Sequence, residues 1–196
     1  MTKHECRSEA SFTIIELLVV IAIIIILAGL ILSTVGYVQK KGARSRAEAE
    51  IAAISAALES YKADNGIYPR GNASGSGTTA PYDTDKLDAR LPIASAYQPA
   101  CLFLYKQLSG DTNANLQPPV GAKSYFSFKP QMLAGARDSN NNITSVIYIR
   151  DPFGNSYGYS TAYQYSPTTG YNPTFDLWSV ADDSSGTNQA QWIKNW

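Results

Sequence analysis

One uninterrupted apolar segment constrains this chain more than any other feature. Every residue from Leu17 to Leu32 is apolar if Gly29 is counted, and the wider stretch 12–32 is long enough to cross a bilayer as a helix. Glu16 lies near the start of that stretch. A carboxylate at the centre of a bilayer costs at least ~2.5–3.5 kcal/mol. The acid therefore needs either an interfacial position or a partner of opposite charge.

The composition excludes several classes of function. The 196 residues include 16 Lys+Arg and 16 Asp+Glu, so the net charge is zero, which argues against an electrostatic binder of nucleic acid. His4 is the only histidine, and Cys6 and Cys101 are the only cysteines. If the N-terminal piece is removed, the remaining chain can build no Ser-His-Asp or Cys-His centre, no His-ligated metal site and no internal disulfide. We therefore expect that this protein is not an enzyme.

Two general interpretations of the apolar segment use length and charge alone. A secretory signal peptide has an apolar region of ~7–15 residues and a small-x-small cleavage site, whereas this run is longer and no such site follows it closely. A plain membrane anchor with Glu16 near the interface is the second interpretation. For an anchor, the basic residues after the segment outnumber Lys3 and Arg7 before it and favour a cytoplasmic body; they are Lys40, Lys41, Arg44 and Arg46.

The order of residues in the segment supports a third interpretation. The stretch SFTIIELLVVIAIII resembles the N-terminal signature of type IV prepilins and type II secretion pseudopilins. The matching positions are Phe12, Thr13, Ile15, Glu16, Leu17, Leu18, Val19 and Val20. The resemblance implies that a leader, residues 1–11, is cut off between Ser11 and Phe12, and that the new terminus at Phe12 is N-methylated. It also implies an assembly role for Glu16, whose charge would pair with the terminal amine one helical turn away. In that family a glycine usually precedes the cut, where this chain has Ser11.

The sequence predicts one long helix over residues 12–64. No proline occurs between the apolar segment and Pro69, and Asn65-Gly66 provides a stop signal. Residues 12–33 would form the transmembrane and assembly part, and residues 34–64 would be amphipathic. The apolar stripe of the second part recurs at helical spacing: Ala47, Ile51, Ile54, Leu58 and Tyr61.

The remaining residues, 65–196, predict a small α+β body. A short helix is expected at 97–108, with Leu102, Phe103, Tyr105 and Leu108 available for the core. Loops are expected at 71–85 and 109–123. Three stretches with strand-like alternation follow, at 142–151, 156–165 and 174–181, with a turn at 151–155. We expect these three strands to form one antiparallel sheet packed on the stripe of the long helix.

Patches of the body resemble the general secretion pathway protein G family, the major pseudopilins of type II secretion. The similar patches are YKADNGIYP, DPFGNSYGY, FDLWSVADD and the terminal IKNW. The stretch 71–140 does not match and is interpreted as a variable insert. The resemblance implies a calcium site after the last strand. Asp182 would be the acidic ligand, and the backbone oxygens of Leu177 and Ser179 would also coordinate the ion. The alternative is an ordinary loop held by Trp192 and Trp196.

Taken together, the resemblance implies a structural subunit of a type II secretion pseudopilus. The expected partners are further copies in a helical filament, a prepilin peptidase, minor pseudopilins and an inner-membrane assembly platform. The chain would sit in the bacterial inner membrane with its body in the periplasm. Alternatives are a type IV pilin for adhesion, motility or DNA uptake, and a membrane-anchored binding module. The tyrosines of such a module could bind sugars, although cross-strand packing is the more usual reason for such pairs: Tyr157, Tyr159, Tyr163 and Tyr165.

Overall fold

The computed structural model describes residues 12–71, 83–90, 97–183 and 185–196, with the backbone alone for residues 32–34. Contacts divide the chain into two compact units, Met1–Lys41 and Gly42–Trp196. The predicted leader, residues 1–11, lies outside the described residues, and so does most of the loop predicted at 71–85.

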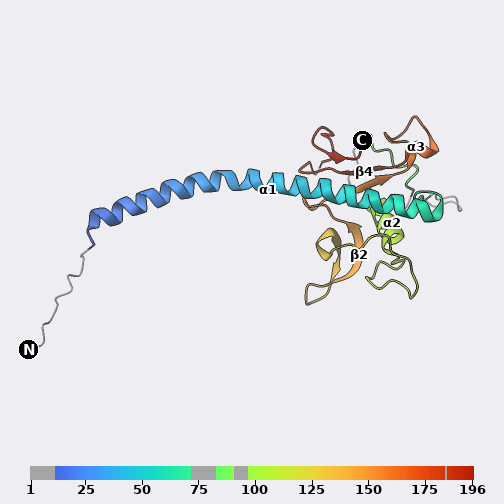
Figure 1. The fold of residues 1–196 in the computed structure, drawn as a ribbon, viewed down its shortest axis with the longest axis horizontal. Helices are drawn as coiled ribbons and strands as arrows, with labels where there is room; N and C mark the ends of the chain where they lie inside the picture. Colours follow the sequence, from blue (N-terminus) through green and yellow to red (C-terminus); the bar gives the residue numbers. More distant parts are fainter. Residues whose placement is uncertain (1–11, 72–82, 91–96, 184) are drawn as a thin grey trace, which may run out of the picture. The chain divides into compact units, whose positions relative to one another are not determined.

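A single helix, α1 (Ile14–Asn65), contains nearly all the described residues of the first unit and the first residues of the second (Figure 1). The prediction of one long helix is confirmed, with the start two residues later and the end one residue later than expected. Helical structure continues through the stretch 29–36, which contains two glycines, a serine and a threonine. Within the described residues, α1 is the one helix long and apolar enough to cross a membrane.

The C-terminus of α1 is the predicted glycine stop. Gly66 adopts a left-handed backbone with φ of 78°, and its N–H donates to the carbonyl of Lys62 at 2.7 Å. Glycine adopts this conformation without the steric cost that a Cβ would add, which is why it commonly ends helices. Pro69 follows, so the chain leaves the helix at the point where the sequence indicates.

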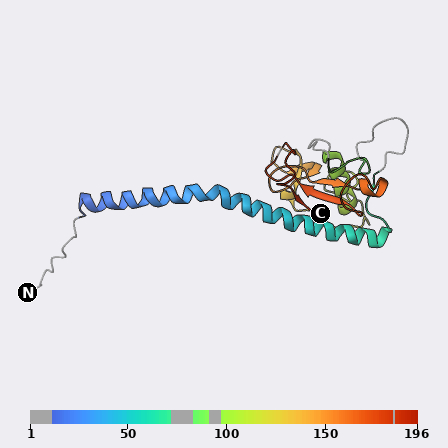
Figure 2. The ribbon, with the colours of Figure 1, turned by 90° about the horizontal axis from the view of Figure 1, so that it is seen from above.

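The amphipathic part of α1 forms one side of the core of the second unit (Figure 2). Ile54 and Leu58 are fully buried, and Ile51 is 5% exposed. Tyr61 is half-buried and donates its hydroxyl to Gln107 at 3.0 Å. The predicted stripe is therefore confirmed, because its residues pack against the body, where Ala57 joins them in the core.

The body contains two antiparallel sheets in place of the single sheet that we predicted. The first pairs β1 (Leu133–Arg137) with β2 (Ile143–Ile149), and the second has the order β3 (Gly158–Ser160), β4 (Asp176–Ser179) and β5 (Ile193–Lys194). An isolated bridge between Arg150 and Ser156 lies where the two sheets meet. The strand β1 was missed because LAGAR has little β-propensity. Its Gly135 is needed because a Cβ there would lie 1.8 Å from the carbonyl oxygen of Ser145.

The strand predicted at 156–165 is half wrong. It ends at Ser160, and residues Ala162–Tyr165 form a one-turn helix, α3. The Ser160 hydroxyl accepts the N–H of Ala162 at 3.1 Å, which turns the chain out of the sheet. The Thr161 hydroxyl donates to Asp85 at 2.7 Å and fixes that exit.

The helix predicted at 97–108 is confirmed as α2 (Tyr97–Ser109), and a 3-10 turn, η2 (Pro130–Met132), precedes β1. The face of α2 that packs into the core differs from the expected one, because Leu102 and Phe103 are only half-buried. The buried face includes Cys101, Leu104, Tyr105 and Leu108. A second, smaller core cluster lies against β4 and consists of Ala89, Tyr97, Trp178, Val180 and Trp192.

Candidate functional site

The first candidate site is the start of α1, where Thr13 and Glu16 form a capping box. The Glu16 carboxylate oxygen Oε2 accepts the Thr13 N–H at 3.0 Å and the Thr13 hydroxyl at 2.7 Å. In return, the Glu16 N–H donates to the Thr13 hydroxyl oxygen at 3.3 Å. These bonds satisfy polar backbone groups that a helix start otherwise leaves without a partner.

The sequence predicted a charge-pairing role for Glu16, and its role as a helix cap was not predicted. The signal was present in the sequence, since Thr-x-x-Glu before an apolar run is the usual signature of a capping box. Phe12 lies one turn before Glu16 and is 75% exposed. Both side chains border a shallow apolar groove together with Ile15, Val19 and Val20. The structure thus places Phe12 and Glu16 on one face, and Ser11 lies outside the described residues.

The apolar surface that follows Glu16 is the second functional feature. Every described side chain from Phe12 to Ile31 is exposed. Ile14 is 86% exposed and Ile25 is 65% exposed. Complete burial of one such side chain is worth about 1.5–3 kcal/mol. A surface of this size is therefore not left in water and has to be covered by lipid or by protein.

The turn 151–155 is organised by a buried carboxylate. The Asp151 oxygen Oδ1 accepts the N–H groups of Phe153 at 3.0 Å and of Asn155 at 2.8 Å, and Oδ2 accepts the Ser179 hydroxyl. Gly154 has φ of 98°, a conformation that favours glycine. Burial raises the pKa of Asp151 above its usual value, although hydrogen bonds from Ser179 and the turn amides oppose that rise. The predicted turn is therefore confirmed, and it ties β2 to β4.

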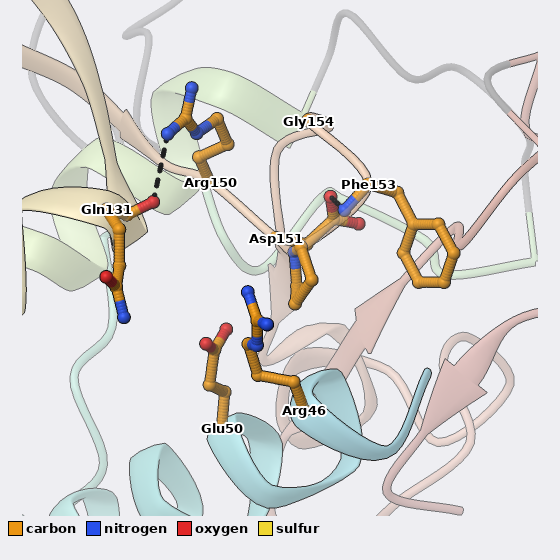
Figure 3. Close-up of a pocket in the computed structure, with 8 residues that line it drawn as sticks. Arg46, Glu50, Gln131, Arg150, Asp151, Phe153 and Gly154 are labelled. Carbon is orange, nitrogen blue, oxygen red and sulfur yellow. Dashed lines mark hydrogen bonds between the residues drawn. The ribbon is translucent and has the colours of Figure 1, made fainter. Parts of the chain in front are cut away.

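The same turn borders a half-open pocket of about 300 Å³ (Figure 3). Arg150 donates from Nη2 to the Gln131 carbonyl at 3.1 Å. Glu50 accepts the Tyr157 hydroxyl at 2.7 Å. The pocket lies where α1, the end of β2 and the turn meet. It is lined by Arg46, Glu50, Gln131, Arg150, Asp151, Pro152, Phe153 and Gly154.

Comparison with protein families identifies the N-terminal feature. Residues 6–32 match the family model of the prokaryotic N-terminal methylation motif. This match spans the predicted cleavage position, Phe12, the capping box and the apolar surface. The chain carries a prepilin-type N-terminus.

Curated proteins of type II secretion are similar to part of this chain. The chain is 41% identical over 63 residues to the type II secretion system core protein G of Pseudomonas aeruginosa and 38% identical to that of Klebsiella michiganensis. Identity to the same protein of Vibrio cholerae is 35% over 63 residues. The first two matches cover 32% of this chain and 44% of each relative, so the chain spans less than half the length of these relatives. No solved structure matches this chain.

The calcium site implied by the pseudopilin resemblance is poorly supplied with ligands. Asp182 is exposed, and the carbonyl of Leu177, one of the two implied backbone ligands, accepts the Asn195 N–H at 3.2 Å. No group of three or more His, Cys, Asp or Glu side chains that could hold a metal occurs in the part of the chain that the structure describes. Calcium prefers 6–8 oxygen ligands, usually with several carboxylates. The described residues therefore do not fit this ion well.

The tyrosines proposed as an alternative binding surface divide into two groups. Tyr157 and Tyr159 are fully buried, and their hydroxyls donate to Glu50 and to the Pro69 carbonyl at 2.7 and 2.8 Å. They therefore join α1 and its C-terminal extension to the second sheet. Tyr163 is half-buried and Tyr165 is exposed, both on α3. The pair at 157 and 159 is thus a packing element.

Proposed function

We propose that this protein is a structural subunit that polymerises into the pseudopilus of a type II secretion system. Its leader would be removed between Ser11 and Phe12, and Phe12 would be N-methylated. The protein would have no enzymatic activity of its own. The observation that carries the proposal is the exposed apolar surface of Phe12–Ile31, which contains Glu16 near its start and lies within the residues that match the methylation motif.

Two kinds of cover suit this surface at different stages. Before assembly, the bilayer can solvate the whole segment, because its length suits the hydrocarbon core. After assembly, the same surfaces of neighbouring copies can bury one another. A contact of this kind joins different surfaces of successive copies, and a repeated contact that does not close into a ring produces a filament. The helix would therefore act first as an anchor and then as the core of the filament.

Glu16 would set the register of that filament. Cleavage before Phe12 creates an amine in an apolar environment, one helical turn from the carboxylate of Glu16. Each charge alone is costly in that environment, whereas a pair between neighbouring copies removes both costs. The capping bonds from Thr13 hold Glu16 near the terminus and use Oε2, so Oε1 could serve the neighbour.

The remaining partners and the location follow from this proposal. A prepilin peptidase would cut and methylate the chain, and minor pseudopilins and an inner-membrane platform would start and extend the filament. Before assembly, the chain would cross the inner membrane once, with the body on the periplasmic side. The similarity to core protein G over 63 residues and the match of residues 6–32 to the methylation motif support this arrangement.

Deletion and complementation test the proposed function. A deletion strain would be complemented with the wild-type chain or with Glu16→Val, and membranes, sheared filaments and exported proteins would be analysed. We expect the wild type to restore export and to form filaments, and Glu16→Val to remain in the membrane without filaments. Filaments of Glu16→Val equal to those of the wild type would contradict the role of Glu16. Intact export with lost adhesion, twitching or DNA uptake in the deletion strain would favour a type IV pilin.

A further inference from the structure

The loop that follows β4 is closed by hydrogen bonds of its own. Asp183 donates its N–H to the Val180 carbonyl at 3.1 Å, and Gly186 donates to the Asp183 carbonyl at 2.9 Å. The Asp183 side chain accepts the Ser185 hydroxyl at Oδ1 and the Asn188 N–H at Oδ2, the latter at 2.6 Å. Both oxygens of this carboxylate therefore already face hydrogen-bond donors inside the loop.

The start of the loop is fixed by the turn 151–155. Asn155 donates from Nδ2 to the Ala181 carbonyl at 2.8 Å, and Ala181 has a left-handed φ of 54°. The Ser179 hydroxyl accepts the Ala181 N–H at 3.0 Å while it donates to the buried carboxylate of Asp151. The carboxylate of Asp151 thus holds Ser179, and Ser179 holds the backbone at Ala181.

The carbonyl oxygens that a cation in this loop would use already accept hydrogen bonds from N–H groups. The carbonyls of Leu177, Val180 and Ala181 accept N–H groups from Asn195, Asp183 and Asn155. Each of these donors carries partial positive charge, which repels a cation at short range. The exposed acid Asp182 does not compensate, because one carboxylate is far from the 6–8 oxygens that calcium prefers.

We propose that Asp183 and Asp151 do for this loop what a bound cation would otherwise do, so that the protein folds and keeps its structure without calcium. The proposal does not depend on the filament function, because it concerns the stability of the chain itself. It departs from the calcium site that the pseudopilin resemblance implies. Here the carboxylates gather N–H and O–H donors directly, and no ion is needed to neutralise them.

Thermal unfolding of the full-length protein in detergent tests this inference. Unfolding would be followed by the fluorescence of the buried tryptophans, in excess EGTA and in excess CaCl2, with MgCl2 as the ionic-strength control. We expect the same Tm in the three buffers. Asp183→Ala should lower the Tm equally in all of them, because it removes the acceptor for Ser185 and Asn188. Asp182→Asn removes the acidic ligand that the resemblance implies, and its Tm should likewise be the same in the three buffers.

Three outcomes would overturn the inference. A Tm that rises with CaCl2 and not with MgCl2 would show a calcium site, and loss of that rise in Asp182→Asn would locate it. A wild-type Tm in Asp183→Ala would show that the carboxylate does not hold the loop. If Asp183→Ala fails to fold, the milder variants Asp183→Asn and Ser179→Ala take its place, and a calcium-dependent recovery of either would also contradict the inference.

Discussion

Glu16 accepts both the amide N–H and the hydroxyl of Thr13, so the one acid of the apolar segment caps the helix that contains it. This relationship gives Glu16 two roles that can be separated. The cap needs an acceptor oxygen, whereas pairing with a terminal amine needs a negative charge. Glutamine keeps the first property and loses the second.

We predict that Glu16→Gln keeps the start of α1 intact but prevents assembly as fully as Glu16→Val. The amide oxygen of glutamine can still accept the Thr13 donors, while the charge that would pair with the Phe12 amine is absent. Sheared filaments examined by electron microscopy measure assembly, and membrane fractionation checks insertion. Thr13→Ala is the matched control, since it loses the hydroxyl and keeps the charge, and it should assemble. Normal filaments from Glu16→Gln would show that the cap, and not the charge, is what assembly requires.

A second prediction concerns the processed terminus. The intact mass of the mature protein should correspond to a chain that begins at Phe12 and carries one added methyl group, ~14 Da. Ser11→Gly should be processed at least as completely as the wild type, because glycine is the usual residue before the cut in the family. Ser11→Lys should accumulate as the precursor. A wild-type mass that still includes residues 1–11 would refute the cleavage position.

The sequence predicted well those elements whose signal is local and periodic. The stripe from Ala47 to Leu58 and the Asn65-Gly66 stop gave α1 almost completely, because helical spacing and a glycine terminus are visible without any partner. The turn 151–155 was equally visible. The division into two sheets was not visible in the sequence, because it depends on which strand pairs with which. That choice rests on β1, a strand of small residues with weak propensity.

The residues of the candidate site could also be predicted only where their signal is local in the sequence. Phe12 and Glu16 could be assigned because the motif is contiguous in sequence. By contrast, Asp151 meets Ser179, 28 residues away, only after β4 is placed beside the turn. The role of Asp183 depends likewise on the backbone path to Asn188. Contacts between side chains and distant backbone groups leave no periodic pattern, so sequence reasoning alone could not assign them.

A third prediction tests the packing of Gly158 against Trp178. A Cβ at position 158 would lie 2.1–2.6 Å from three atoms of the Trp178 ring, which is fully buried. The indole has little room to move, because Tyr97 packs edge-on against it at 4.9 Å. We expect Gly158→Ala to lower the free energy of unfolding by about 1–3 kcal/mol, the usual cost of overpacking. Urea denaturation followed by tryptophan fluorescence measures this change.

Gly42→Ala is the matched control for that substitution. Gly42 lies inside α1, and a Cβ added there would have open space around it to a distance of 4 Å, so alanine meets no obstacle. Alanine favours a helix over glycine by roughly 0.5–1 kcal/mol, and the control should be neutral or slightly stabilising. Equal stability of Gly158→Ala and the wild type would show that the ring of Trp178 can move aside.

The last prediction concerns the pH dependence of the Cys101 thiol. The side chain is fully buried, its sulfur accepts the Ile149 N–H at 3.2 Å, and burial raises the pKa of the thiol to about 12. Only the thiolate reacts with disulfide reagents. In a Cys6→Ser background, Cys101 should therefore stay unlabelled from pH 7 to about pH 9 and react at once in denaturant. Ser139→Cys supplies an exposed control thiol in the same background. Labelling of Cys101 in the folded protein as fast as that of the control would show that β2 and α2 open far more readily than their packing indicates.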